Sequence, residues 1–366
     1  MAKDPIIRKM FPGGITYQGF YSYYQYLAGG EKIRIYIIKG GPGVGKSTFM
    51  KKIAAEILKL GYELEYHCCS TDRNSLDGVY IPQLGIALLD GTAPHEVDPK
   101  YPGAVDEIIN LGDYWDESKI IPYREDIIAT RHKISRFFQG AYFALKDVKN
   151  ALDEWDFYLE PYQNWQEINK FYLEISEVLR DSSGSGEGGE RHLFAWGHTP
   201  QGKTQYIDSL IQGTNTLYLL KGQGGTGKAT LLARLAEYSK ILNLQREIYH
   251  NPLEPQKIDL LVLPALKLSL AISSPDYPYN PDFSGEIITL DFDQYLDSQN
   301  LKTLQENLVS CRQRIEDGYN RANAQTQQAK SLHDSLEGYY IEAMNFAGIE
   351  KKREEVLEEI ISYIHL

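Results

Sequence analysis

The sequence has few cysteines, no long hydrophobic run and no excess of basic residues. Its three cysteines, Cys68, Cys69 and Cys311, are too few for a disulfide framework, and no Cys or His spacing is typical of a zinc site. The longest apolar stretch, around 260–273, is interrupted by proline and lysine and is too short to span a bilayer. The N-terminal residues lack the apolar core of a secretory signal. We therefore expect a cytoplasmic protein without a membrane span.

The charge balance is acidic. The chain has 38 Lys and Arg against 50 Asp and Glu, a net charge of −12 over 366 residues. Affinity for nucleic acids comes mainly from clustered Lys and Arg, so we expect no general nucleic-acid binding. Hydrophobic residues make up 42% and charged residues 24%, a composition that allows a packed core. The length suggests two domains.

The chain contains an internal repeat. Tyr36–Thr48 reads YIIKGGPGVGKST and Tyr218–Thr230 reads YLLKGQGGTGKAT, so the copies are offset by 218 − 36 = 182 residues. A Gly/Ser-rich run at 181–190 separates them and has the composition of a flexible linker. We predict two homologous domains, at 1–180 and 191–366.

Each copy has the same predicted order of elements. Apolar runs at 33–39 and 216–221 indicate buried strands, and each is followed by a glycine-rich turn and a helix at 46–60 or 228–242. Alternating strands and helices predict an α/β fold with a mostly parallel sheet in three α/β/α layers. Later in each copy, apolar residues recur at spacings of three, four or seven. This period predicts a long C-terminal helical hairpin in each domain.

The first glycine-rich turn matches the phosphate-binding pattern G-x-x-x-x-G-K-[ST], also called Walker A, in full. Glycines let backbone N–H groups approach a phosphate closely, and the helix N-terminus adds positive charge. In this pattern Lys46 contacts the β- and γ-phosphates, and the hydroxyl of Ser47 binds Mg²⁺. The predicted nucleotide-binding residues are Gly40, Gly41, Pro42, Gly43, Val44, Gly45, Lys46, Ser47 and Thr48.

A second element of such sites is an acid at the end of a neighbouring strand, which holds Mg²⁺ through water. The run Gly85–Asp90 fits best, so we assign Asp90 to the metal together with Ser47, and to catalysis together with Lys46. Asp77 is the rival acid. Its place at the start of a strand favours a role in a turn or cap.

Other side chains are weaker candidates. His95 follows Asp90 and could contact substrate or water, because histidine transfers protons near neutral pH, although a lone loop histidine is more often structural. Four arginines could stabilise a transferred phosphoryl group, and an ordinary surface charge is the alternative for each: Arg73, Arg124, Arg131 and Arg136.

The second glycine-rich turn keeps its glycines and Lys228 but lacks both metal-side groups. Ala229 stands where the Mg²⁺ hydroxyl belongs, and Ile272 stands at the position of Asp90. We predict a degenerate site that can bind a phosphate but does not support Mg²⁺-assisted transfer. Its residues are Gly222, Gln223, Gly224, Gly225, Thr226, Gly227, Lys228, Ala229 and Thr230.

Through Gly40–Ser47 the chain resembles P-loop NTPases, and the loop is similar to those of AAA-type ATPases. Over nearly its full length, the pattern resembles a bacterial family of tandem, duplicated P-loop ATPase-like proteins. The resemblance implies ATP binding and hydrolysis but no defined cellular role. The partitioning ATPases fit poorly because Gly41 replaces their signature lysine. The guanine-recognition motif of GTPases and the signature motif of ABC ATPases are absent.

Three functions remain open. The leading hypothesis is an Mg²⁺-dependent ATPase that is active at the first loop, with the second copy as its regulator and the two repeats paired within one chain. A P-loop kinase for a small molecule or nucleotide is the first alternative, with the helical hairpin as its lid. A nucleotide sensor or scaffold without turnover is the second. The expected ligands are ATP and Mg²⁺, and an unidentified protein partner is left open.

Overall fold

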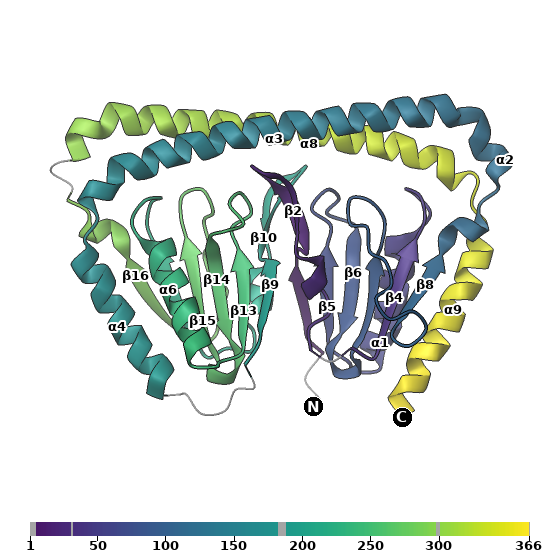
Figure 1. Ribbon diagram of the computed structural model, residues 1–366, viewed down its shortest axis with the longest axis horizontal. Coiled ribbons are helices and arrows are strands. Elements are labelled where there is room, and N and C mark those ends of the chain that lie inside the picture. Colours follow the sequence, from purple (N-terminus) through teal and green to yellow (C-terminus); the bar gives the residue numbers. More distant parts are fainter. Residues whose placement is uncertain (1–4, 31, 182–187, 298–300, 366) are drawn as a thin grey trace.

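The computed structural model describes residues 5–30, 32–181, 188–297 and 301–365. Two six-stranded sheets stand side by side beneath a pair of long helices (Figure 1). Most of the predicted linker, 182–187, lies outside the described residues. Within the described residues, no helix is long and apolar enough to cross a membrane.

The two sheets have the same strand order, as the repeat predicts. Across the first sheet the order is β1 (Ile7–Met10), β5 (Leu64–Cys68), β6 (Leu76–Ile81), β7 (Ile86–Asp90), β4 (Arg34–Lys39) and β8 (Asp106–Asn110). The second sheet repeats this order with β9 (Glu190–Phe194), β13 (Arg246–His250), β14 (Ile258–Leu263), β15 (Leu268–Ser273), β12 (Thr216–Lys221) and β16 (Glu286–Asp291). In each sheet only the third strand, β6 or β14, runs antiparallel to its neighbours. The predicted mixed α/β fold with mostly parallel sheets is confirmed.

Smaller elements also recur in both repeats. A hairpin of β2 (Gly13–Thr16) and β3 (Gly19–Ser22) corresponds to β10 (Trp196–Thr199) and β11 (Gly202–Gln205). Helices α1 (Lys46–Lys59) and α6 (Lys228–Ile241) follow the two glycine-rich turns. Two short helices, α2 (Glu117–Ile120) and α5 (Ile207–Leu210), complete the connections. The apolar face of α1, including Met50, Ile53 and Ile57, is buried in the core of the first sheet.

The C-terminal helices of each repeat pack on the other repeat. Helix α3 (Arg124–Leu159) starts beside the first sheet and ends beside the second, where α4 (Trp165–Asp181) packs on α6 (Figure 1). Helix α8 (Gln305–Ile341) runs back across the molecule, and α9 (Phe346–Ser362) then packs beside α1.

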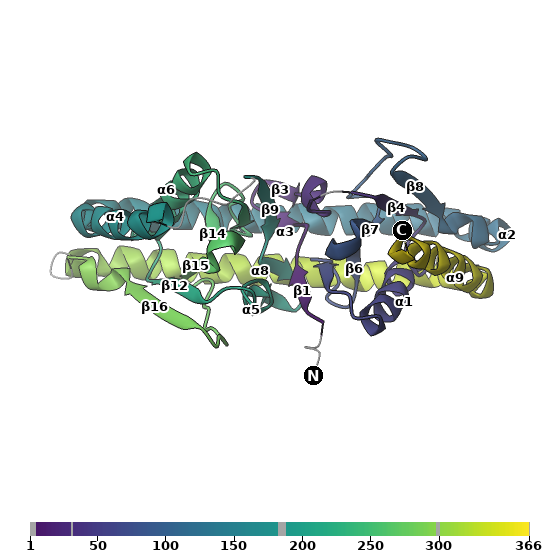
Figure 2. The same cartoon turned by 90° about the horizontal axis from the view of Figure 1, so that it is seen from below.

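The predicted hairpin within each repeat is therefore wrong. Helices α3 and α8 pair with each other along their length (Figure 2). They approach closely where Gly318 meets Val148, since an added Cβ on the glycine would lie 2.5 Å from the valine side chain. An apolar stripe shows that a helix needs a partner but not which helix supplies it. The boundaries 1–180 and 191–366 mark the sequence repeats, whereas each packed half exchanges helices with the other.

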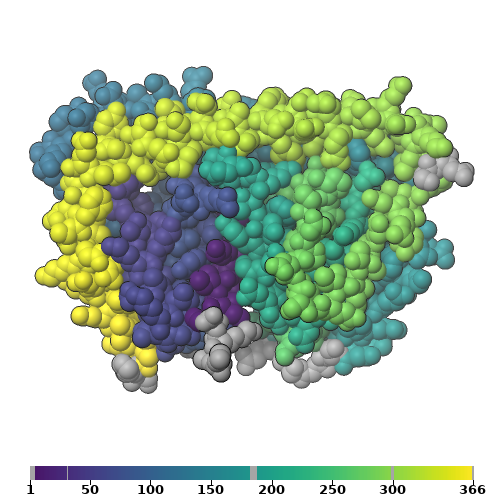
Figure 3. Space-filling view, turned by 180° about the vertical axis from the view of Figure 1, so that it is seen from behind, coloured from purple at the N-terminus to yellow at the C-terminus, as the bar shows by residue number. Residues whose placement is uncertain are grey.

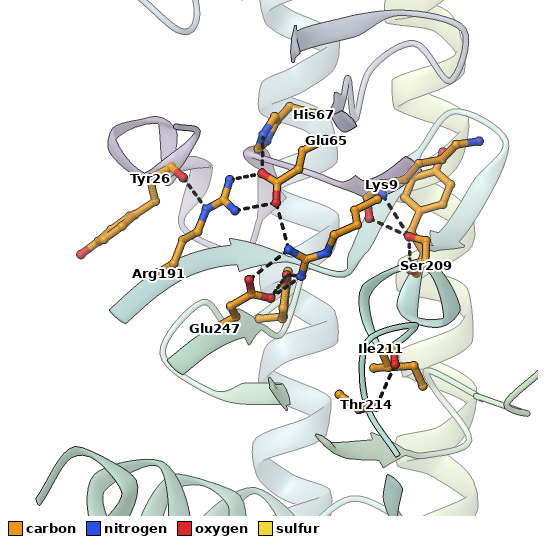
Figure 4. A network of polar contacts seen from close by, with 12 residues as sticks. Lys9, Tyr26, Glu65, His67, Arg191, Ser209, Ile211, Thr214 and Glu247 are labelled. Carbon is orange, nitrogen blue, oxygen red and sulfur yellow. Dashed lines mark hydrogen bonds and ion pairs between the residues drawn. The ribbon is translucent and has the colours of Figure 1, made fainter. Parts of the chain in front are cut away.

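A buried ion-pair network joins the two sheets at the centre (Figure 4). Arg191 of the second repeat donates to both carboxylate oxygens of Glu65, at 2.9 and 2.6 Å. Arg8 of the first repeat donates to Glu65 at 2.9 Å and also to Glu247 of the second. Burial alone would raise the pKa of Glu65, but Arg191 and Arg8 outweigh it, and the pKa is lowered. These bonds fix the two halves against each other.

Candidate functional site

The first glycine-rich loop joins β4 to α1 and has a backbone that requires glycine. Three of its glycines have positive φ, and Gly45 is the N-cap residue of α1, which begins at Lys46. The second loop has nearly the same φ values at the equivalent glycines. In order, these values are 150°, 70° and 90° at Gly40, Gly43 and Gly45, and 140°, 72° and 91° at Gly222, Gly225 and Gly227.

Helix α8 of the second repeat packs directly on the first loop. A Cβ added to Gly41 would lie 2.9 Å from the ring of Tyr340, and one added to Gly43 would lie 2.9 Å from the carbonyl oxygen of Glu337. Gly41 and Gly43 must be small because the backbone of the loop is in contact with α8. The candidate site of the first half is therefore completed by the other repeat.

The predicted site residues come together at the carboxyl ends of β4 and β7. Lys46 Nζ donates to the carbonyl oxygens of Gly40 and Gly41 at 3.2 and 2.8 Å and lies 3.6 Å from the carboxylate of Asp90. Asp90 accepts bonds from the backbone N–H and hydroxyl of Thr92, and Ser47 Oγ accepts one from the N–H of Leu76. Burial raises the pKa of Asp90, and the opposing effects of Lys46 and Thr92 do not cancel this rise.

A cavity of about 970 Å³ lies over this edge of the first sheet. Figure 3 shows the molecule hollowed beneath α8 on the side of the first half. The glycine-rich loop, Asp90 and His95 line the cavity, as does Arg131 from α3. The other three arginine candidates, Arg73, Arg124 and Arg136, are not among its lining residues. Only Arg131 is thus placed to meet a group bound there.

Asp77 also lines the cavity, and its interpretation as a turn or cap residue is wrong. It is the second residue of β6, it is only 5% exposed, and its Oδ2 lies 3.4 Å from Nε2 of His95. Strand β6 is antiparallel to β7, with Gly78 opposite Leu89. One step further in this register, Asp77 stands opposite Asp90. The direction of β6, which sequence patterns do not reveal, brings the two acids together.

Sequence reasoning missed three cavity-lining residues on α8: Lys330, His333 and Glu337. Lys330 Nζ lies 3.2 Å from Asp72, and His333 Nδ1 lies 3.4 Å from Glu337. Burial lowers the pKa of His333. His333, Asp334 and Glu337 have ligand atoms within 4.8 Å of one another, close enough to hold a cation. The i,i+4 spacing of His333 and Glu337 was a usable signal, but the sequence did not show that α8 covers the first loop.

In the second loop, Lys228 hydrogen-bonds to groups of the loop itself, and α3 covers the loop from outside. Lys228 is 5% exposed and donates to Gly222 O at 2.7 Å, to Thr226 Oγ1 at 2.8 Å and to Gln223 O. Burial lowers its pKa to about 8. Trp155 Nε1 donates to Gly224 O at 3.2 Å, which covers the loop from outside.

The predicted loss of metal-side groups in the second half agrees with the strand registers. Ile272 pairs with Leu220 in the second sheet, as Asp90 pairs with Ile38 in the first. Ala229 packs against the apolar core. Apolar side chains therefore occupy both positions where the first half has the oxygen atoms of Ser47 and Asp90.

Comparison of the chain with protein-family models, with curated proteins and with solved structures finds no match in any of the three.

Proposed function

We propose that the first half is a P-loop NTPase domain that binds ATP with Mg²⁺ and hydrolyses it. One observation carries this proposal: Lys46, Ser47 and Asp90 lie together on the wall of one large cavity. They surround a loop whose glycines have positive φ and which leads into the N-terminus of α1. A helix N-terminus with such a loop attracts phosphate through its backbone N–H groups and dipole.

The residues present fit both ligands. Gly40, Gly43 and Gly45 have positive φ, and glycines in this conformation let the backbone N–H groups of a loop approach a phosphate closely. Ser47 and Asp90 offer the oxygen ligands that Mg²⁺ prefers. Lys46 now donates to carbonyls of its own loop and would exchange these bonds for phosphate oxygens. Bound Mg²⁺ would neutralise charge on the phosphates.

The second half is proposed as a structural and regulatory partner rather than a second catalytic site. Lys228 is held by three groups of its own loop, and Trp155 covers Gly224. The positions of the metal-side groups are apolar, at Ala229 and Ile272. Its contribution to the first site is the long helix α8, which forms the roof over Gly41 and Gly43.

The deciding experiment measures Mg²⁺-dependent ATP binding and phosphate release with the wild type, Lys46→Ala and Lys228→Ala. We expect Lys46→Ala to abolish release and Lys228→Ala to retain it per folded molecule. Asp90→Asn should weaken the Mg²⁺ dependence and lower the rate. If the wild type binds no ATP, or if both lysine variants lose activity equally in folded protein, the proposal is wrong.

One observation favours a kinase as the second candidate. The cavity extends beyond the glycine-rich loop to apolar side chains of Ile15, Phe20, Phe138 and Tyr142, which could surround a small acceptor molecule. A panel of hydroxyl-bearing metabolites would test it. A kinase would consume ATP faster with one of them without releasing more phosphate.

A further inference from the structure

An arginine on the roof of the first cavity is left without a counter-charge. Arg131 of α3 lines the cavity, and its side chain is exposed. Among the residues that the structure describes, none forms a hydrogen bond or an ion pair with it. A guanidinium keeps its charge at neutral pH and offers five N–H donors in a planar fork that matches the oxygens of a phosphate. Arg131 is therefore free to bind an anion in the cavity.

The packing of the two long helices places Arg131 above the glycine-rich loop. Helices α3 and α8 run antiparallel side by side (Figure 2), and Gly140 of α3 meets Gln325 of α8, where an added Cβ would lie 2.7 Å from the amide oxygen. Nine residues from this contact, α3 reaches Arg131 (140 − 9) and α8 reaches Asp334 (325 + 9), because both helices rise equally per residue. Arg131 thus lies less than one turn of α8 from the level of Glu337, which contacts the loop.

Arg312 is the counterpart of Arg131 in the second half. Glu337 of α8 covers the first loop as Asp156 of α3 covers the second, so the two helices correspond at an offset of 337 − 156 = 181 residues. Since 131 + 181 = 312, the repeat places an arginine at this position of both helices. The same residue can therefore be compared beside a complete loop and beside a degenerate one.

Arg312 shows how far a side chain at this position extends toward the loop. Its guanidinium carbon lies 4.8 Å from the centre of the Trp155 ring. The indole in turn donates to the carbonyl oxygen of Gly224, the third residue of the second loop. The third residue of the first loop is Pro42, which lines the first cavity as Arg131 does. An arginine at this position therefore reaches the flank of the phosphate-binding loop.

In the second half this arginine is already neutralised. Arg312 Nη1 lies 2.8 Å from the carboxylate of Asp276. At the repeat offset of 182 residues, Asp276 corresponds to Pro94, which lines the first cavity and carries no charge. Leu336, which also lines the first cavity, stands at the position of Trp155 (155 + 181). The half with the complete glycine-rich pattern therefore keeps its arginine free, whereas the degenerate half supplies an anion of its own.

We propose that Arg131 binds the terminal phosphate of ATP and stabilises its charge during hydrolysis. This inference rests on the hydrolytic function proposed above. The oxygen of a water molecule forms the new P–O bond, the bond to the bridging oxygen breaks with its electron pair left on ADP, and one proton of the water is released to solvent. Arg131 donates N–H groups to oxygens of the terminal phosphate and itself gains or loses no proton. Its contribution is largest in the transition state, where charge is redistributed over these oxygens.

The test compares ATP binding, kcat, and the binding of ADP with aluminium fluoride, a mimic of the phosphoryl group during transfer, in the wild type and three variants. We expect Arg131→Gln to bind ATP nearly as well as the wild type, to lower kcat about 10²–10³-fold and to lose affinity for the mimic. Added guanidinium should restore part of the Arg131→Ala rate. Arg131→Lys should recover only part of kcat, because lysine keeps the charge without the planar fork. Arg136→Gln is the matched control, since Arg136 is exposed on the same helix and is not among the lining residues of the cavity.

Each outcome decides the question. If the wild type turns over and Arg131→Gln keeps both its kcat and its affinity for the mimic, the role of Arg131 is wrong and the hydrolase stands. If Arg131→Ala loses ATP binding together with turnover and guanidinium restores neither, or if Arg136→Gln loses as much kcat, the effect is structural and the proposal is overturned. If the wild type releases no phosphate at all, the hydrolytic function itself fails, and the role of Arg131 with it.

Discussion

The indole N–H of Trp155 donates to the carbonyl oxygen of Gly224 over 3.2 Å, from a helix that begins in the other repeat. Its neighbour Asp156 lies against Gly225, where an added Cβ would come within 3.1 Å of the aspartate Cα. In the first half, Glu337 lies against Gly43 in the equivalent way. Both loops are thus covered by a helix from the opposite repeat. The cavity at the first loop, about 970 Å³, is larger than the one of about 420 Å³ that Trp155 and Gln223 line at the second.

A tryptophan beside the first loop should report nucleotide binding. The ring of Trp115 lies 3.5 Å from the place of a Cβ on Gly41, so a phosphate bound at the loop would alter its surroundings. We expect Mg²⁺ and ATP to change intrinsic fluorescence in the wild type and in Trp155→Phe but not in Trp115→Phe. An unchanged response in Trp115→Phe would show that binding occurs elsewhere.

A buried acid in the second half should make stability depend on pH. Burial raises the pKa of Asp259 to about 7 from 3.8. The folded state therefore binds more protons than the unfolded state between about pH 4 and 7, and the free energy of unfolding should fall as pH rises through this window. Asp259→Asn should flatten that fall and stabilise the protein at pH 8 by about 1–3 kcal/mol.

Urea denaturation at a series of pH values measures this effect. The exposed Asp282→Asn is the control, and it should leave the pH profile as it is. A steeper fall in Asp259→Asn than in the wild type would contradict the raised pKa.

The ion pairs between the sheets should matter for stability. Arg191→Met leaves the carboxylate of Glu65, which is buried at the centre, only partly compensated by Arg8 and by the ring of His67 at 3.9 Å. Breaking a buried pair costs about 3–5 kcal/mol because an uncompensated charge stays inside. The double variant Arg191→Met with Glu65→Gln should recover part of this loss in chemical denaturation.

An exposed pair between the long helices provides the comparison. Arg321 and Asp147 lie 2.7 Å apart with side chains 58% and 62% exposed. Solvent screens such pairs, so Arg321→Met should change stability little. Equal losses for Arg321→Met and Arg191→Met would show that the central network has no special role.

Cutting the chain between the repeats should not separate them. A specific protease site placed within 182–187 divides the chain into two fragments. The fragments should still elute together in size-exclusion chromatography, because α4 packs on α6, α9 packs beside α1, and α3 pairs with α8. The uncut protein gives the reference elution volume. Dissociation at micromolar concentration would argue against the exchange of helices.

Local features of this molecule were predictable from the sequence, whereas its long-range pairings were not. The glycine pattern at Gly40–Ser47 identified the loop between strand and helix because positive φ and close contact leave little choice but glycine. The repeat likewise predicted a second loop with the same backbone. The position of Asp90 at the end of a strand followed from the apolar run before it.

The errors arose where partners distant in sequence decide the outcome. The helical spacing of apolar residues identified the long helices. An apolar stripe of this kind can pack on either sheet, so the sequence did not show that the two repeats exchange helices. Lys330, His333 and Glu337 were missed for this reason. The predicted turn or cap role of Asp77 was wrong because no sequence pattern shows that β6 runs antiparallel to β7.

The covering of the first loop by α8 also sets an order of events during protein synthesis. The loop at Gly43 and its strands leave the ribosome early, whereas Glu337 and Tyr340 are made only after the whole second sheet. A nascent chain therefore carries an uncovered glycine-rich loop throughout the translation of the second repeat. The cavity can acquire its roof, and its proposed activity, only once α8 has been synthesised and has crossed back over the first sheet.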